Sequence, residues 1–152
     1  MLCNIKNAKT IPMNNDILES NLEKFHKSFE HFESIVLKAP KFDSSVAYSS
    51  EELEIFDALT SRFVRLYETT IQLFRTIDSL QSMHISESFG ELITNMLKLN
   101  VIVNDEIWFE MRMIRNKISH DYLPAQLQMM ITLITNKFYP EFGKVKLWNS
   151  KV

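Results

Sequence analysis

The chain has 152 residues, a length typical of one domain that is large enough to bury a core. Hydrophobic residues make up 45% and charged residues 24% of the chain, which excludes a disordered polymer. The net charge of −2, from 17 basic and 19 acidic residues, excludes a general attraction for nucleic acid, so any phosphate-binding site must be a local concentration of positive charge.

Other features of the composition narrow the class further. Only two glycines and four prolines occur, so we expect few turns and a small number of long helices. The single cysteine, Cys3, excludes an internal disulfide and argues against a cysteine-based metal site. No apolar run has the length of a signal peptide core or a membrane span, so we expect a cytoplasmic protein that does not enter a membrane.

The first predicted helix begins at a cap among residues 14–16 and ends near Leu37. It stops there because Pro40 disfavours the helical conformation at the preceding Ala39. Eight apolar residues recur at helical spacing and form its predicted buried face: Ile17, Leu18, Leu22, Phe25, Phe29, Phe32, Ile35 and Val36.

The second predicted helix is the longest and covers about residues 50–83. Ser49 and Glu52 have the spacing of a capping box, which marks its start. A heptad-like stripe should lie along a neighbouring helix, and its members are Phe56, Leu59, Phe63, Leu66, Thr70, Leu73, Ile77 and Leu80.

Two shorter helices are predicted next. Ser88 and Glu91 repeat the capping-box spacing before a helix that carries Leu92, Met96 and Leu99. A fourth helix should begin near Asn104 or Asp105 and end near Asp121 or Tyr122. Its predicted buried residues are Ile107, Trp108, Met111, Ile114 and Ile118.

A fifth helix should begin at Pro124, because proline suits a first helical turn, and end at Tyr139-Pro140. Its predicted inward residues are Leu127, Met130, Ile131, Ile134 and Phe138. The fold class is therefore all-α, an antiparallel up-and-down bundle of four to five helices. We expect one domain over residues 1–152, with a core at about 15–140 and loose terminal tails.

Residues 115–122 read Arg-Asn-Lys-Ile-Ser-His-Asp-Tyr and form the candidate functional centre. Asn116 and His120 are four residues apart, hence neighbours on one helix face, and the long side chain of Arg115 can curl to the same patch. Tyr122 follows the expected helix end. Arginine can bind a phosphodiester and stabilise the charge of its transition state, and histidine can transfer a proton near neutral pH. Asparagine can orient the arginine or the histidine, and tyrosine can donate a hydrogen bond to phosphate or stack on a base.

A purely structural interpretation of this segment stays open on the residues alone. His120 would favour the negative end of the helix dipole, and Arg115 would pair with Asp121 or Glu110. His26 and His31 are interpreted as solvated, because their spacing of five residues does not place them on one helix face as a metal pair. His84 follows the end of the long helix and is interpreted as favouring its C-terminal dipole. No Gly-rich phosphate loop, Ser-His-Asp set or acidic metal cluster is present, so we expect neither a metal nor a cofactor.

The pattern Arg-x4-His-x-Tyr on the fourth helix of a small bundle resembles the HEPN superfamily, specifically the HepT-like ribonuclease toxins. These toxins are partners of minimal nucleotidyltransferase (MNT) antitoxins. The segments 56–66 and 108–114 are also similar to this branch, and the resemblance covers about residues 15–140. It implies a metal-independent endoribonuclease that forms a homodimer around the motif helices and cleaves RNA.

By that resemblance, Arg115 binds the scissile phosphate and His120 is the general acid or base. Asn116 orients the site and Tyr122 supports RNA contact. Tyr122 also matches the residue that the antitoxin modifies with adenylate, which would block the cleft by bulk and negative charge. Lys117 and either Arg62 or Arg112 are further candidates for a basic cleft.

Two other functions remain open. The chain could be a binding subunit of a nucleotidyltransferase, without catalysis of its own, which its low net charge suits. It could also be a dimeric scaffold in which the stripe from Phe56 to Leu80 only joins subunits.

Overall fold

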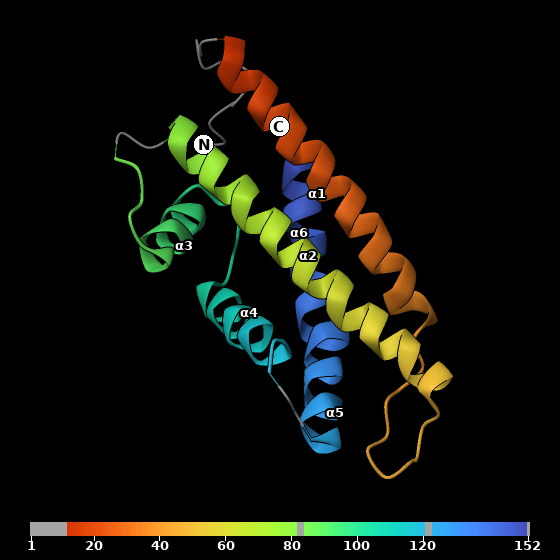
Figure 1. Ribbon diagram of the computed structural model, residues 1–152. Helices are drawn as coiled ribbons and strands as arrows, with labels where there is room; N and C mark the ends of the chain where they lie inside the picture. Colours follow the sequence, from red (N-terminus) through yellow and green to blue (C-terminus); the bar gives the residue numbers. More distant parts are fainter. Residues whose placement is uncertain (1–11, 82–83, 121–122, 152) are drawn as a thin grey trace.

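The computed structural model describes residues 12–81, 84–120 and 123–151, and this part of the chain contains helices and connecting turns but no strand (Figure 1). The elements are α1 (Pro12–Lys38), α2 (Ser50–Gln81), α3 (Phe89–Lys98), α4 (Asp105–Ile118), α5 (Pro124–Leu133), the π-helical turn η2 (Ile134–Phe138) and α6 (Tyr139–Ser150). Since α5, η2 and α6 follow one another without a break, they form one helical run, which we call the C-terminal run. With this run counted as one helix, the predicted all-α antiparallel bundle of four to five helices is confirmed. None of the described helices combines the length and apolar character needed to cross a bilayer.

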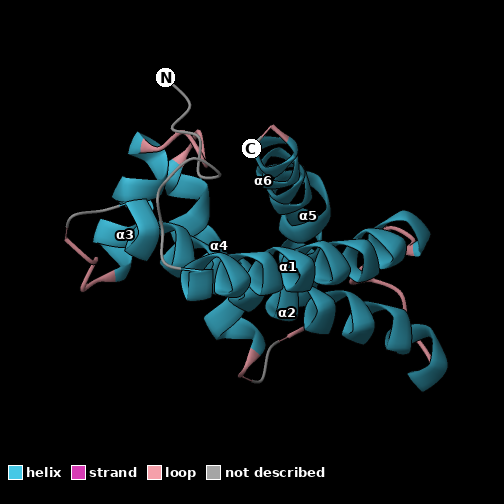
Figure 2. Ribbon diagram, turned by 90° about the horizontal axis from the view of Figure 1, so that it is seen from above, coloured by secondary structure: helices cyan, strands magenta, loops and turns pink. Residues whose placement is uncertain are grey.

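The helix α2 is the centre of the bundle. It pairs with α1 in an antiparallel hairpin and also packs against α3, α4 and α5 (Figure 1). Figure 2 shows α3 and α4 grouped at one end of the α1–α2 pair, and α5 and α6 near its middle. The site that is described below lies where α4 meets α2.

The predicted stripe of α2 is buried within the monomer. Phe56 is 1% exposed, while Leu59, Phe63, Leu66, Thr70, Leu73 and Ile77 are all 0% exposed. Leu80 is partly buried against the same core. The hypothesis that this stripe joins subunits is therefore wrong, because the chain's own helices already cover it.

The capping signals mark real helix starts. At α2, the Glu52 amide donates to Ser49 Oγ at 3.2 Å and the Ser49 amide donates to Glu52 Oε2 at 2.8 Å, which completes the capping box. At α3, the Glu91 amide donates to Ser88 Oγ at 3.2 Å, but the Glu91 carboxylate accepts from the amide of Glu87 instead of Ser88. Asn104 caps α4 through Oδ1, which accepts from the amide of Ile107 at 3.4 Å.

The predicted inner face of α1 is largely confirmed, with one error. Leu18, Phe25, Phe29, Phe32 and Ile35 are buried, but the side chain of Ile17 is 54% exposed. Consecutive residues lie about 100° apart around a helix, so Ile17 and Leu18 do not share the narrow face that α2 covers.

The C-terminal segment corrects a second prediction. The helix does not end at Tyr139-Pro140, and the following residues are not a loose tail, because α6 extends to Ser150 with Phe142 and Val145 buried. Pro140 has no amide hydrogen for the carbonyl four residues earlier and its ring crowds that carbonyl. The π turn η2 widens the backbone just before it, with the Tyr139 amide bonded to the carbonyl of Ile134, and the helix continues through the proline.

Aromatic packing fixes the position of α4. Trp108 is fully buried and meets the ring of Phe74 on α2 at 4.9 Å and the ring of Phe142 on α6 at 5.5 Å, both edge to face. Lys137 in η2 also pairs with Glu110 on α4 at 2.5 Å. The helix α4, which carries the candidate residues, is therefore held in place by both α2 and the C-terminal run.

We expect Phe142→Ala to lower the free energy of unfolding by about 3–5 kcal/mol, because it leaves a cavity among Phe32, Phe63 and Trp108. Chemical denaturation followed by circular dichroism measures this change. The matched control is Leu147→Ala on the same helix, where the side chain is 62% exposed and the change should stay within about 0.5 kcal/mol. Equal, small effects of both substitutions would show that α6 does not stabilise the fold.

Candidate functional site

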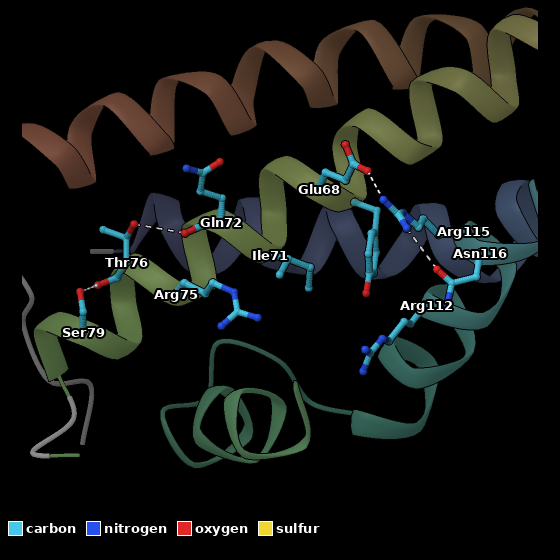
Figure 3. Close-up of a pocket in the computed structure, with 10 residues that line it drawn as sticks. Glu68, Ile71, Gln72, Arg75, Thr76, Ser79, Arg112, Arg115 and Asn116 are labelled. Carbon is cyan, nitrogen blue, oxygen red and sulfur yellow. Dashed lines mark hydrogen bonds and ion pairs between the residues drawn. The ribbon is translucent and has the colours of Figure 1, made fainter. Parts of the chain in front are cut away.

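A hollow of about 590 Å³ lies between α2 and α4, and Figure 3 shows the side chains that line it. We call it the α2–α4 hollow. Its polar lining includes Glu68, Gln72, Arg75, Arg112, Arg115 and Asn116, with the phenol ring of Tyr67 and the side chain of Ile71 between them. The site therefore combines residues that are far apart in the sequence, from the C-terminal half of α2 and from the last two turns of α4.

Both terminal nitrogens of the Arg115 guanidinium group form hydrogen bonds. Its Nη2 donates to Glu68 Oε1 on α2 at 2.5 Å, and its Nη1 donates to Asn116 Oδ1 at 3.1 Å (Figure 3). The side chains of Arg115 and Glu68 are 38% and 53% exposed, so solvent screens the pair and its contribution to stability is small. The ion pair thus orients the guanidinium group of Arg115 but leaves this group available to an anion that binds it more strongly than Glu68 does.

The predicted structural partners of Arg115 differ from the observed one. Glu110 pairs with Lys137, and the carboxylate that meets Arg115 is Glu68. Asp121, the other expected partner, lies outside the described residues.

Two further arginines extend the positive charge of the hollow. Arg112 lies over the ring of Phe89 at 4.6 Å, a cation–π contact that holds it between α3 and α4. Arg75 enters from α2, two turns beyond Glu68. Three guanidinium groups against the one carboxylate of Glu68 leave a local charge of +2 on a protein whose total charge is −2.

The phenol of Tyr67 lies beneath these cations. Burial raises the pKa of Tyr67 to about 12, although the nearby guanidinium groups of Arg112, Arg115 and Arg75 oppose the shift. The hydroxyl is therefore neutral at physiological pH and remains a hydrogen-bond donor. A buried donor beside three guanidinium groups can bind oxygen atoms of a phosphate or carboxylate.

The structure brings together only part of the predicted site. Arg115 and Asn116 both line the α2–α4 hollow, whereas His120 is exposed and does not line it. The helix α4 ends at Ile118, earlier than predicted, and His120 follows in a turn where its amide donates to the carbonyl of Lys117 at 3.0 Å. The expected helical neighbours Asn116 and His120 are thus separated by a helix end. Tyr122 lies outside the described residues.

The residues that α2 contributes to the hollow lie outside the sequence motif. Tyr67, Glu68 and Arg75 lie beside the apolar stripe on its polar margin, and Glu68, Gln72 and Arg75 recur at helical spacing. That spacing could have indicated a polar stripe on α2. The sequence alone did not reveal that this stripe faces α4. Of the two further arginines weighed for a basic cleft, Arg112 lines this hollow and Arg62 lines another one.

Among the described residues, no group of three or more His, Cys, Asp or Glu side chains is arranged to hold a metal ion. His31 is exposed, as predicted for a solvated side chain, and His84 is exposed as well. His26 differs, because its Nε2 forms a 2.7 Å hydrogen bond with Asn149 Nδ2 on α6 and its ring meets Phe25 edge to face.

Comparison with protein families places this architecture in a known class. A family described as nucleotidyltransferase substrate binding protein like has a sequence model that matches residues 20–148. The chain belongs to this family. The match includes α2, α4 and most of α6, and it agrees with the HEPN-like fold that the motif implied. No curated protein matches the chain.

Proposed function

We propose that the chain is the toxin of a HEPN/MNT toxin–antitoxin pair, a metal-independent endoribonuclease whose site is centred on Arg115 and His120. The observation that carries this proposal is that Arg115 of the Arg-x4-His-x-Tyr segment lines a hollow together with Arg75, Arg112 and the neutral phenol of Tyr67. A flexible single strand of RNA could place a phosphate among these donors and its ribose near the exposed end of α4.

In this mechanism Arg115 exchanges its carboxylate partner for a phosphate. The guanidinium group of Arg115, which pairs with Glu68 in the free protein, would bind two oxygens of the scissile phosphodiester and stabilise the charge that grows on it. Arg112, Arg75 and the Tyr67 hydroxyl would hold the neighbouring part of the strand. His120 would take a proton from the attacking 2′-hydroxyl or give one to the leaving 5′-oxygen, and Asn116 would keep Arg115 aligned.

The site would be completed by a second copy of the chain. On α4, Phe109 and Met113 are four residues apart and 42% and 59% exposed, which leaves an apolar surface beside Arg112 and Asn116. Pairing of two α4 helices through this surface would bury it and bring both copies of Arg115 and His120 to one cleft. It would also double the positive charge that faces the RNA.

A nucleotidyltransferase would be the antitoxin and would adenylylate Tyr122. Tyr122 follows His120 by two residues, so an adenylate there would place bulk and negative charge at the end of α4, where the RNA phosphate is expected. The family's association with nucleotidyltransferases supports such a partner.

A second function is favoured by two observations. The family description refers to substrate binding, and in the monomer Arg115 is paired while His120 lies outside the hollow. The chain would then be a partner subunit that binds a nucleotidyltransferase or its phosphate-bearing substrate, without catalysis of its own.

We expect Arg115→Ala and His120→Ala each to lower the rate of RNA cleavage by at least about 100-fold, because each removes a group that acts in the transition state. Cleavage of labelled single-stranded RNA in EDTA, resolved on denaturing gels, measures the rate and tests metal independence. The matched control is His84→Ala, an exposed histidine outside both the motif and the hollow, which should retain the wild-type rate.

The cleavage assay, together with a measurement of nucleotidyltransferase binding, separates the two functions. Wild-type protein that cleaves no RNA but forms a stable complex with a nucleotidyltransferase would establish the partner subunit and overturn the ribonuclease. Full cleavage by His120→Ala would remove His120 from the mechanism.

We expect Met113→Asp to convert a dimer into a monomer, because it places a charge in the apolar surface of α4. Light scattering coupled to size-exclusion chromatography measures the mass in solution. Met129→Asp is the control, since Met129 is also exposed (43%) but lies on α5. A wild-type protein that is already monomeric at micromolar concentration would contradict the shared cleft.

We expect coexpression with a cognate MNT-type nucleotidyltransferase to add one adenylate to Tyr122 and to abolish RNA cleavage. Mass spectrometry of tryptic peptides locates the adduct. Tyr122→Phe should remain unmodified, while Tyr48→Phe, a substitution far from the motif in the sequence, should be modified normally. An adduct on any other residue would contradict the assignment.

A further inference from the structure

A second hollow, of about 360 Å³, lies between α1 and α2. We call it the α1–α2 hollow. Five of its lining side chains are basic, namely Lys24, Lys27, His31, Arg62 and Arg65, and the other two are Ser28 and Thr69. No carboxylate lines it, so four side chains that are charged at neutral pH face one another on a protein whose net charge is −2.

The hydrogen bonds of this hollow do not neutralise its charge. The Arg62 guanidinium donates to the backbone carbonyl of His31 at 2.9 Å, which fixes its position without a counter-charge. Ser28 Oγ and Thr69 Oγ1 lie 3.3 Å apart and bridge the two helices at the floor. In the part of the chain that the structure describes, Lys24, Lys27 and Arg65 form no ion pair with a carboxylate.

The two hollows follow one another along α2. Residues of an α-helix are spaced by 100°, so the directions of Arg65 in the α1–α2 hollow and Gln72 in the α2–α4 hollow differ by only about 20° around α2. Along the helix axis, Arg65 and Arg75 are about 15 Å apart. Figure 3 shows Gln72 and Thr76, which line the α2–α4 hollow, on the side of α2 that is turned toward α1. A chain of phosphates can therefore pass from one hollow to the other without leaving the surface of α2.

We propose that the α1–α2 hollow is a second phosphate-binding site, which holds the backbone of the RNA strand away from the cleavage site. Its lining contains guanidinium, ammonium and hydroxyl groups but no aromatic ring on which a base could stack, so it recognises the backbone and not the sequence. A flexible strand can contact both hollows at once, which favours RNA over the acidic surface of a folded protein. This proposal depends on the proposed function only in taking RNA as the ligand.

The test is the binding of a fluorescein-labelled single-stranded oligouridylate, measured by fluorescence anisotropy between about 50 and 200 mM salt. Every protein carries His120→Ala so that the probe stays intact. The double variant Lys27→Gln/Arg65→Gln should bind about tenfold more weakly at physiological salt. The slope of log Kd against log salt should become shallower by about 1.4, because each lost contact to a single strand removes about 0.7.

The matched control is Lys41→Gln/Lys98→Gln, which removes the same charge from two exposed lysines that line neither hollow. Its affinity should stay within about twofold of the parent, and circular dichroism should show that both double variants are folded. Equal weakening by the two double variants would overturn the proposal, because the effect would then come from net charge alone.

The remaining outcomes are distinct from a failure of the proposed function. Unchanged RNA binding by Lys27→Gln/Arg65→Gln would overturn the second site and leave cleavage by Arg115 and His120 intact. Loss of nucleotidyltransferase binding in that variant, with RNA binding unchanged, would assign the hollow to an acidic protein surface instead. RNA binding that depends on Lys27 and Arg65, together with a wild-type chain that cleaves no RNA in the cleavage assay, would support the second site and exclude the ribonuclease.

Discussion

The burial of the apolar stripe of α2 is the constraint on which the rest of the structure depends. From Phe56 to Ile77 this stripe is almost completely removed from solvent, and α1, α4 and α5 cover it. Once that face is fixed inside the bundle, the polar face of α2 has a fixed direction as well. On this face Glu68 and Arg75 line the α2–α4 hollow, and Arg65 lines the α1–α2 hollow.

The charge of the protein is segregated by this arrangement. The molecule is mildly acidic, yet both hollows along α2 carry a local excess of positive charge. Local concentration of this kind attracts a phosphate chain without making the whole surface bind nucleic acid. In the α2–α4 hollow the single carboxylate of Glu68 holds Arg115 in place in the absence of an anion, and its partial exposure keeps the pair weak.

The C-terminal run contributes to the site although none of its residues lines the α2–α4 hollow. Phe142 packs against Trp108, and Lys137 pairs with Glu110, so the C-terminal run contacts α4 at two points. This support exists because the π turn lets the helix continue through Pro140. These contacts, with that of Trp108 to Phe74, set the place of α4 and therefore of Arg112 and Arg115 relative to Arg75 on α2.

The sequence by itself determined the helices, their capped starts and most of the buried faces, because these depend on local hydrogen bonding and on a period of 3.6 residues. It also pointed to Arg115 and Asn116, which the structure places in a hollow. It failed at Pro140, where the π turn lets the helix continue through a proline, and at the end of α4, where it kept His120 on the helix. Only the tertiary structure brought Glu68, Tyr67 and Arg75 to Arg115, because their meeting depends on which edge of α2 faces α4, and that orientation is decided by the packing of the whole core.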